Sequence, residues 1–249
     1  GTLKAFSDSE VHKVLERSGI KKKLFDTKNK ANEWFVTDLE TVKKAIKAVK
    51  EGRDSLHASE VSTKQTPIVF RPEQQDAINK TKRRFRSGNK MLWYAKMRFG
   101  KTLSALQVIK DHQFKRTLII THRPVVDKGW YEDFNKIFYD SPEYFYGSKN
   151  KGDRFETLEK QHSSKNTKYV YFASMQDLRG SESVGGDFDK NDEIFNTLWD
   201  FIIIDEAHEG TQTELGENVL NELIKENTKA LYLSGTPFNL LDDYQENEI

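Results

Sequence analysis

The sequence has no cysteine, and only five prolines and three methionines among its 249 residues. The absence of cysteine excludes a disulfide framework and thiolate metal sites. No apolar run approaches the roughly 18–20 residues that a membrane-spanning helix needs. The first ten residues, GTLKAFSDSE, also lack the basic-then-apolar order of a signal peptide. These features lead us to expect a cytoplasmic protein without a membrane partner.

The charged residues nearly balance over the whole chain, with a net charge of +1, but they are unevenly distributed. Residues 67–130 hold 15 Lys+Arg against 4 Asp+Glu, whereas residues 131–249 hold 11 against 25. A basic block of this kind attracts phosphate, either of a nucleotide or of a nucleic acid. Uneven charge is also common without function, so the block alone decides nothing.

Residues 1–54 are expected to form a small, mostly helical segment. The stretches SDSE (7–10) and TDLE (37–40) are typical capping boxes, and apolar residues follow each of them at helical spacing. Residues 55–67 are largely polar and unpatterned, which predicts a linker.

Residues 68–249 are expected to form one α/β domain. Short apolar runs alternate with helix-length segments, at 91–95, 117–121, 169–174, 201–205 and 230–234. This alternation predicts βαβ units and a mainly parallel sheet with helices on both faces. Each run is continuously apolar, as expected for strands that are buried on both sides.

The stretch AKMRFGKT (95–102) follows the first of these strands and precedes a helical pattern. Backbone N–H groups at a helix N-terminus bind phosphate, a lysine such as Lys101 reaches the β- and γ-phosphates, and the Thr102 hydroxyl ligates Mg²⁺. The stretch has only one glycine, so taken alone it is weak evidence for an ATP site.

The stretch FIIIDEAH (201–208) is an apolar strand that ends in two carboxylates. In a Mg–nucleotide site Asp205 would hold the coordination sphere of the metal, and Glu206 would polarise the attacking water. The two stretches together predict ATP and Mg²⁺ as cofactors, with Lys101, Asp205 and Glu206 as the catalytic residues.

The stretch FRPEQQDAI (70–78) precedes the first predicted strand. Proline at the first turn, followed by Glu73, is a good helix start on its own. The functional interpretation is that the Gln74 amide binds the adenine edge and so selects ATP.

These motifs resemble, in order, those of the first RecA-like domain of a superfamily 2 DEAD/DEAH helicase, in the branch of the type I and type III restriction motors. RPEQQ is similar to the adenine motif, AKMRFGKT to motif I, DEAH to motif II and LSGTP (233–237) to motif III. The resemblance implies a RecA-like P-loop NTPase fold. It also implies nucleotide contacts from Arg71, Gln74, Arg98, Phe99, Gly100, Lys101 and Thr102.

The same resemblance implies DNA as a partner, with RNA as an alternative. TLIITHRPVVDKGW (117–130) and YFASMQDL (171–178) resemble the nucleic-acid-facing motifs. They place Thr121, Arg123, Ser174 and Gln176 against backbone phosphates and sugars, where contacts position a strand without reading its sequence. His208, Ser234 and Thr236 are implied to couple nucleotide to nucleic acid.

Two departures from the family pattern limit these expectations. Arg98 stands where motif I usually has a glycine, and it either adds a phosphate contact or points to solvent. The sequence stops at Ile249, shortly after motif III. We therefore expect a fragment that lacks the second RecA-like domain and hydrolyses ATP poorly alone.

The N-terminal segment has a fainter resemblance, over about 45 residues, to the C-terminal half of phage-type GIY-YIG nuclease domains. FSDSEVHKVLERSGI followed by NEWF places His12 at the helix histidine and Glu33 at the metal-binding glutamate. The alternative is a small helical adaptor with Trp34 and Phe35 as its core.

The leading hypothesis is the ATP-binding half of an ATP-dependent DNA helicase or translocase, serving restriction or phage defence. One alternative is a nuclease–motor fusion fragment whose main activity is DNA cleavage, and another is a nucleic-acid-binding module without ATPase activity. A kinase-like P-loop enzyme would need neither LSGTP nor a DNA-facing motif. The sequence leaves the oligomeric state open.

Overall fold

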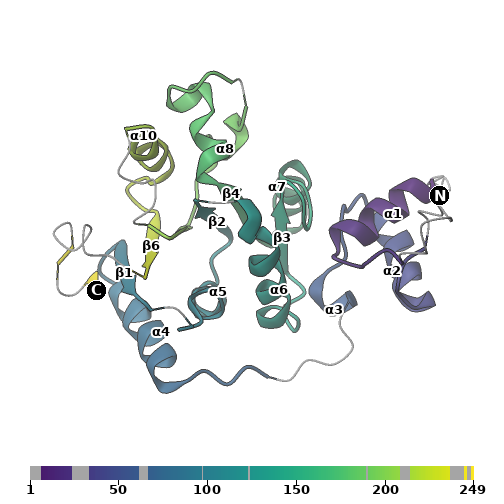
Figure 1. Ribbon diagram of the computed structural model, residues 1–249, viewed down its shortest axis with the longest axis horizontal. Helices are drawn as coiled ribbons and strands as arrows, with labels where there is room; N and C mark the ends of the chain where they lie inside the picture. Colours follow the sequence, from purple (N-terminus) through teal and green to yellow (C-terminus); the bar gives the residue numbers. More distant parts are fainter. Residues whose placement is uncertain are drawn as a thin grey trace.

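The structure is a computed structural model that places most of the chain (Figure 1). It describes residues 7–23, 34–61, 67–96, 98–122, 124–188, 190–207, 214–235, 244–245 and 248–249. None of the helices in these ranges is long and apolar enough to cross a membrane.

The centre of the fold is a parallel sheet, which confirms the predicted α/β class. Within the described residues the sheet has six strands in the order β1-β6-β5-β2-β4-β3. The strands are β1 (Lys90–Tyr94), β2 (Arg116–Thr121), β3 (Tyr144–Ser148), β4 (Lys168–Ser174), β5 (Phe201–Asp205) and β6 (Lys229–Ser234). Because all strands run the same way, their carboxyl ends meet at one edge of the sheet.

Helices cover both faces of the sheet (Figure 1). One face packs against α4 (Pro72–Arg84), α5 (Lys101–His112) and α6 (Asp127–Ile137). The other packs against α7 (Phe155–Lys165), α8 (Met175–Arg179), α9 (Asp192–Phe195) and α10 (Glu214–Leu223). Two short 3₁₀ turns, η1 (Pro124–Val126) and η2 (Glu182–Val184), lie in the connections. Side chains alternate between the two cores along β2, β4, β5 and β6, so these strands are buried from both sides.

Strand β3 is a correction to the sequence prediction, which had no strand at 144–148. Its side chains are mostly aromatic and the strand contains Gly147. Phe145 is only half-buried, and β4 is the one named strand that pairs with β3 among the described residues. A short aromatic edge strand interrupted by glycine lacks the continuous Val/Ile/Leu pattern of the central strands.

The N-terminal helices α1 (Asp8–Arg17) and α2 (Leu39–Lys50) form a small core of their own, centred on Val14, Leu15 and Ala45. The predicted capping box of α1 is present, with Ser7 N donating to the Glu10 carboxylate at 2.8 Å. The one predicted at Thr37 is wrong by one residue. Asp38 is the N-cap of α2, and its carboxylate accepts from Thr41 N at 2.8 Å.

Residues 55–61 of the predicted linker are packed against their neighbours. Leu56 belongs to the N-terminal core, and α3 (Ala58–Val61) follows it. The His57 ring is buried and its Nε2 lies 3.2 Å from the carbonyl oxygen of Ser141 in the sheet domain. Leu56 and Ala58 are buried, and Val61 packs against the N-terminal core. Residues 62–66 lie outside the described ranges.

Candidate functional site

The loop between β1 and α5 ends at Gly100, a position whose backbone conformation favours glycine. Gly100 precedes α5 with φ +84°, in the left-handed region. A Cβ at Gly100 would lie 2.5 Å from Gln74 Nε2. Both the conformation and the space therefore select glycine here. The loop leads the chain into the first turn of α5, where Lys101 and Thr102 are half-buried.

Arg71 and Gln74 hold this loop from α4. Arg71 Nη2 donates to the Phe99 carbonyl at 2.7 Å, and Gln74 Nε2 donates to the same oxygen at 2.7 Å. The Gln74 Oε1 in turn accepts from Arg71 N at 2.8 Å. The predicted adenine contact of Gln74 stays a prediction. In this structure the amide fixes the loop, a role that the sequence did not indicate.

Arg98 takes an unusual conformation for a residue with a side chain. Its φ is +67°, the left-handed region that glycine favours. Its side chain is exposed, and its carbonyl accepts from Arg71 Nη2 at 3.2 Å. The tight turn that the family pattern fills with glycine is therefore made here by a strained arginine.

The predicted catalytic residues come together at the carboxyl edge of the sheet. Lys101 Nζ lies 2.7 Å from Glu206 Oε1 and 4.0 Å from Asp205 Oδ1. The sheet order explains this, because β1 and β5 both flank β6 and end at the same edge. Burial raises the pKa of Asp205, while the nearby Lys101 cation opposes the rise and the Glu206 carboxylate adds to it.

These residues fit a Mg–nucleotide complex. Among the described residues no group of three His, Cys, Asp or Glu side chains could hold a metal ion on its own. Mg²⁺ at nucleotide sites uses one or two protein ligands together with phosphate oxygens, so a complete protein cage is not needed. Asp205, with its side chain only 14% exposed, and the hydroxyl of Thr102 are the ligands that the edge offers.

A second set of predicted residues lies further along the same edge. Thr121 at the end of β2 is in register with Asp205 of β5 on one side and Ser174 of β4 on the other. Ser174 is also the N-cap of α8, where its hydroxyl accepts from Asp177 N at 3.2 Å. The row Asp205–Thr121–Ser174 therefore connects the two sets of residues across three adjacent strands.

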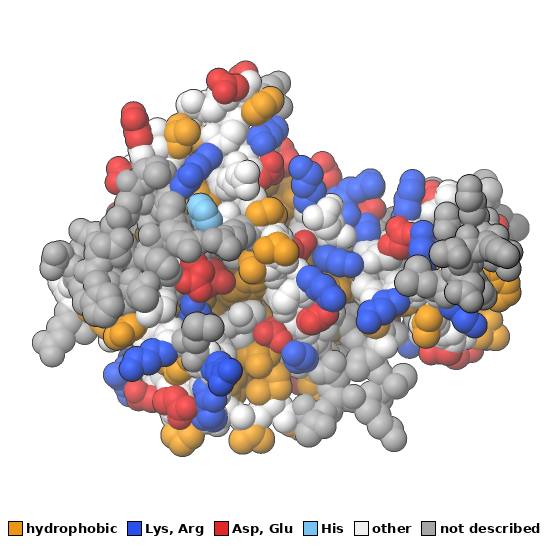
Figure 2. All heavy atoms as spheres, in the orientation of Figure 1, with side chains coloured by type: hydrophobic (Ala, Val, Ile, Leu, Met, Phe, Trp, Pro, Cys, Tyr) orange, Lys and Arg blue, Asp and Glu red, His pale blue; other side chains and the backbone are white. Residues whose placement is uncertain are grey.

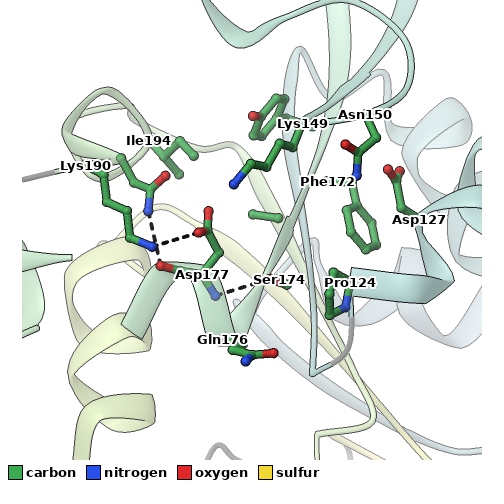
Figure 3. Close-up of a pocket in the computed structure, with 13 residues that line it drawn as sticks. Pro124, Asp127, Lys149, Asn150, Phe172, Ser174, Gln176, Asp177, Lys190 and Ile194 are labelled. Atoms are coloured by element: carbon green, nitrogen blue, oxygen red, sulfur yellow. Dashed lines mark hydrogen bonds and ion pairs between the residues drawn. The ribbon is translucent and has the colours of Figure 1, made fainter. Parts of the chain in front are cut away.

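Ser174 and Gln176 line a cleft of about 540 Å³ (Figure 3). Several of its other polar lining residues were missed by the sequence interpretation, namely Asp127, Lys149, Asn150, Lys190 and Asn191. Lys149 and Asn150 follow the unpredicted strand β3, so their place could not be inferred. Lys190 and Asn191 lie near the end of the stretch GSESVGGDFDKND (180–192), whose small and acidic residues predict a loop.

Four predicted site residues, Glu33, Arg123, His208 and Thr236, lie outside the described residues. Ser234 ends β6, where its carbonyl accepts from Ala95 N at 2.9 Å, beside the nucleotide loop. The His12 ring packs on Phe35, with ring centroids 5.3 Å apart. Nothing observed here tests the nuclease resemblance of this segment, which stays a prediction.

Known proteins resemble both this fold and this sequence. The family described as type III restriction enzyme, res subunit, matches residues 67–239. A protein of Mycoplasma pneumoniae, assigned by name to type II restriction enzymes and methyltransferases, is 28% identical over 148 residues. That match covers 56% of this chain and 20% of the mycoplasma protein.

Three solved structures share the fold at low sequence identity. The SWI2/SNF2 ATPase core of Sulfolobus solfataricus in complex with dsDNA has a TM-score of 0.53 at 19% identity, over 75% of this chain and 36% of that one. The ATP-dependent type ISP restriction-modification enzyme LlaBIII, bound to DNA, has a TM-score of 0.51 at 15% identity, over 76% and 15%. The UvsW helicase of bacteriophage T4 has a TM-score of 0.50 at 12% identity, over 94% and 88%.

The parallel sheet, the glycine-lysine loop and the paired carboxylates define a RecA-like domain of the helicase-like superfamily 2 class. The match over more than half of its length shows that this chain belongs to the type III restriction enzyme res subunit family. The chain spans about a fifth of the mycoplasma relative and about a third of the archaeal ATPase core.

Proposed function

We propose that this chain is the ATP-binding half of an ATP-dependent DNA helicase or translocase, acting in restriction or phage defence. The observation that carries the proposal is the position of Lys101 between two carboxylates, at the edge where β1 and β5 end. A lysine at the start of a helix and an Asp–Glu pair at a strand end are the parts that a Mg–ATP site requires.

Glu206 is the present partner of Lys101, at 2.7 Å. When a nucleotide arrives, its phosphates offer the ammonium a more highly charged partner than Glu206 does. Lys101 would then turn to the β- and γ-phosphates, and Glu206 would be left to orient a water molecule. Mg²⁺, when bound, would neutralise charge on the phosphate oxygens, with Asp205 and Thr102 as its protein ligands.

Hydrolysis is proposed to need a second RecA-like domain, as the resemblance to superfamily 2 motors implies. This domain alone would bind ATP and turn it over slowly. Ser234, whose carbonyl holds the start of the nucleotide loop, is a candidate for coupling the site to the motion of the motor, together with His208 and Thr236.

DNA is proposed as the track because two of the fold relatives were solved on DNA and belong to ATPase or restriction classes. Thr121, Ser174 and Gln176 lie on the edge that the resemblance assigns to backbone contacts, and Arg123 belongs to the same motif. Such contacts bind any sequence, as a translocating motor requires.

Isothermal titration with ATP and ADP in Mg²⁺ tests the nucleotide site. Wild-type protein is expected to bind both, and Lys101→Ala is expected to weaken binding by at least about tenfold, or 1.4 kcal/mol. Lys43→Ala removes an exposed lysine from α2 and is the matched control. Equal affinity in wild type and Lys101→Ala would overturn the proposal. A DNA mobility shift with and without nucleotide separates a motor from a module that ignores ATP.

A further inference from the structure

The loop that connects β3 to α7 (residues 149–154) is held more firmly than surface loops usually are. Just before the loop, at the end of β3, the Ser148 hydroxyl donates to Asp127 Oδ2 at 2.7 Å. The same hydroxyl accepts from the backbone N–H groups of Asn150 at 3.1 Å and Lys151 at 2.8 Å. Asp127 and Ser148 are both buried, so the first half of the loop is tied to α6 through a polar contact shielded from water.

Arg17 holds the same loop from α1. Its guanidinium donates to the carbonyls of Gly152 at 2.6 Å, Ser148 at 2.9 Å and Lys149 at 3.1 Å. Gly152 N returns a hydrogen bond to the Arg17 carbonyl at 3.1 Å. One arginine thus satisfies several loop carbonyls and joins the N-terminal helices to the sheet domain.

Asp153 provides a third attachment. Its buried carboxylate accepts from Asp54 N at 3.1 Å and from the Ser55 hydroxyl at 2.8 Å, both in the segment after α2. Contacts of three polar groups, Asp127, Arg17 and Asp153, therefore offset the entropy cost of ordering this loop. The side chains of Lys149 and Asn150, which take no part in these attachments, remain exposed at its tip.

Lys149 and Asn150 lie between two clefts and line both of them. The first is the cleft that Ser174 and Gln176 also line, and in Figure 3 the Lys149 side chain points toward it. The second, of about 660 Å³, lies against the N-terminal helices. Its charged lining residues are Glu10, Lys13, Glu16, Arg17, Arg53, Asp54, Lys149, Lys151 and Arg154. Figure 2 shows Lys and Arg side chains on the face where the sheet domain meets these helices.

The carboxylates in this lining already have partners. Glu10 accepts from Ser7 N, Glu16 pairs with Lys22, and Asp54 accepts from Arg154 N at 3.1 Å and from the Thr157 hydroxyl at 2.6 Å. In the first cleft Asp177 pairs with Lys190 at 2.8 Å.

The lining of the second cleft holds six Lys and Arg side chains against three Asp and Glu side chains. Among the described residues, the side chains of Lys13, Lys149 and Arg154 form no ion pair or hydrogen bond, and all three are exposed. The second cleft also has no exposed large hydrophobic side chain in its lining. A surface with surplus cations and no apolar patch suits a phosphate backbone better than an apolar peptide.

We propose that the 149–154 loop and α1 continue the DNA path from the sheet edge onto the N-terminal helices, with Lys149, Lys13 and Arg154 binding backbone phosphates. This inference rests on the proposed function, and it gives the N-terminal segment a role that does not depend on nuclease chemistry. Arg17 is a positioning residue in it, because its donors are occupied by loop carbonyls.

The test is DNA binding measured by fluorescence anisotropy over a range of salt concentrations, with a labelled duplex. The triple variant Lys13→Ala, Lys149→Ala, Arg154→Ala is expected to bind at least about tenfold more weakly at low salt. The slope of its log affinity against log salt concentration should be smaller in magnitude by about 2 to 3. This change corresponds to about one for each lost phosphate contact. The control, Lys43→Ala, Lys47→Ala, Lys80→Ala, removes the same charge from exposed positions on α2 and α4 and should leave the slope unchanged.

A second experiment measures how close position 149 lies to bound DNA. The chain has no cysteine, so Lys149→Cys carries a single thiol for a photo-crosslinker, with Lys43→Cys as its control. Crosslinking to DNA from position 149 alone is expected. A wild-type slope in the triple variant, or equal crosslinking from positions 149 and 43, would overturn this inference and leave the nucleotide site untouched. Wild-type protein that binds ATP but no DNA would overturn both the inference and the DNA part of the proposed function.

Discussion

The ammonium of Lys101 lies 2.7 Å from the carboxylate of Glu206, although 105 positions separate the two residues in the sequence. The two groups form an ion pair. The side chain of Glu206 is 42% exposed, so water screens the pair and its strength is modest. In the proposed function, a pair of this strength could be exchanged for a nucleotide phosphate at little cost in free energy.

Replacing Glu206 by glutamine should strengthen nucleotide binding. Glu206→Gln removes both the competing partner of Lys101 and a negative charge close to the phosphates. The breaking of an exposed pair is worth up to about 1 kcal/mol, which predicts an affinity for Mg–ATP higher by up to about fivefold. Titration calorimetry measures this directly. Binding weakened tenfold would show that Glu206 supports the nucleotide instead of competing with it.

Gly100→Ala should damage the nucleotide loop. The new Cβ would meet Gln74 Nε2 at 2.5 Å, and φ of +84° costs a residue with a side chain about 1–2 kcal/mol. We expect a lower free energy of unfolding and weaker ATP binding, measured by denaturant titration and calorimetry. The control is Gly129→Ala in α6, where the added Cβ has no heavy atom within 4 Å. There alanine should stabilise the helix by up to about 1 kcal/mol.

Arg98→Gly should leave the fold intact or slightly more stable. Glycine adopts φ of +67° without strain, although it loses more backbone entropy on folding, so a net gain of at most about 1 kcal/mol is expected. Arg98→Ala keeps the strain and removes only the cation. ATP affinity reduced equally in both variants would assign Arg98 a phosphate contact, and unchanged affinity would place the side chain in solvent.

Asp153→Asn should flatten the dependence of stability on pH. Burial raises the pKa of Asp153 to about 6 from the ordinary 3.8, with the Ser55 hydroxyl opposing the rise. The folded protein therefore holds this proton more tightly than the unfolded chain. The contribution is complete below about pH 3.8 and is lost as pH rises through about 6, by roughly 2–3 kcal/mol. Asparagine avoids this loss, since it carries no charge at any pH.

Denaturant titrations of wild type and Asp153→Asn between about pH 2.5 and pH 7.5 check this prediction. Asp38→Asn is a control of opposite sign, because the hydrogen bond from Thr41 N lowers the pKa of Asp38. Its contribution is present above the ordinary pKa and is lost as pH falls. Parallel curves for wild type and Asp153→Asn would show that Asp153 keeps an ordinary pKa.

Arg17→Lys should loosen the 149–154 loop without unfolding the protein. A lysine keeps the charge but cannot reproduce the planar fork that meets several carbonyls. Hydrogen exchange at the amides of Lys151 and Gly152 is expected to quicken in the variant. Exchange in β5, at the centre of the sheet, should stay unchanged. Protection at the loop equal to wild type would show that Asp127 and Asp153 hold it without Arg17.

The central strands could be predicted from the sequence because burial on both faces leaves an uninterrupted apolar pattern. The strand end at Asp205 and the loop at Lys101 were predicted for the same reason, since both follow such strands. Their meeting could not be predicted from local patterns, because it depends on β6 lying between β1 and β5. The resemblance to a known family supplied that relationship.

The features that the sequence did not indicate are those that depend on distant partners. Arg17 looks like an ordinary helix-end cation until the fold brings residues 148–152 to it. Asp153 looks like a turn residue in a polar stretch, yet it is buried against Asp54 and Ser55. Single polar residues carry no periodic signal, so only the tertiary structure shows which of them hold segments together.

The row Asp205–Thr121–Ser174 has a mechanical consequence. These residues sit on neighbouring strands and are locked in register by the sheet, so no hinge lies between them. The sheet holds the row rigid, and in the proposed function the nucleotide would lie at the Asp205 end and the nucleic acid at the Ser174 end. We therefore expect the two ends to move as one body, so that any motion of the proposed motor would occur between this domain and a second one.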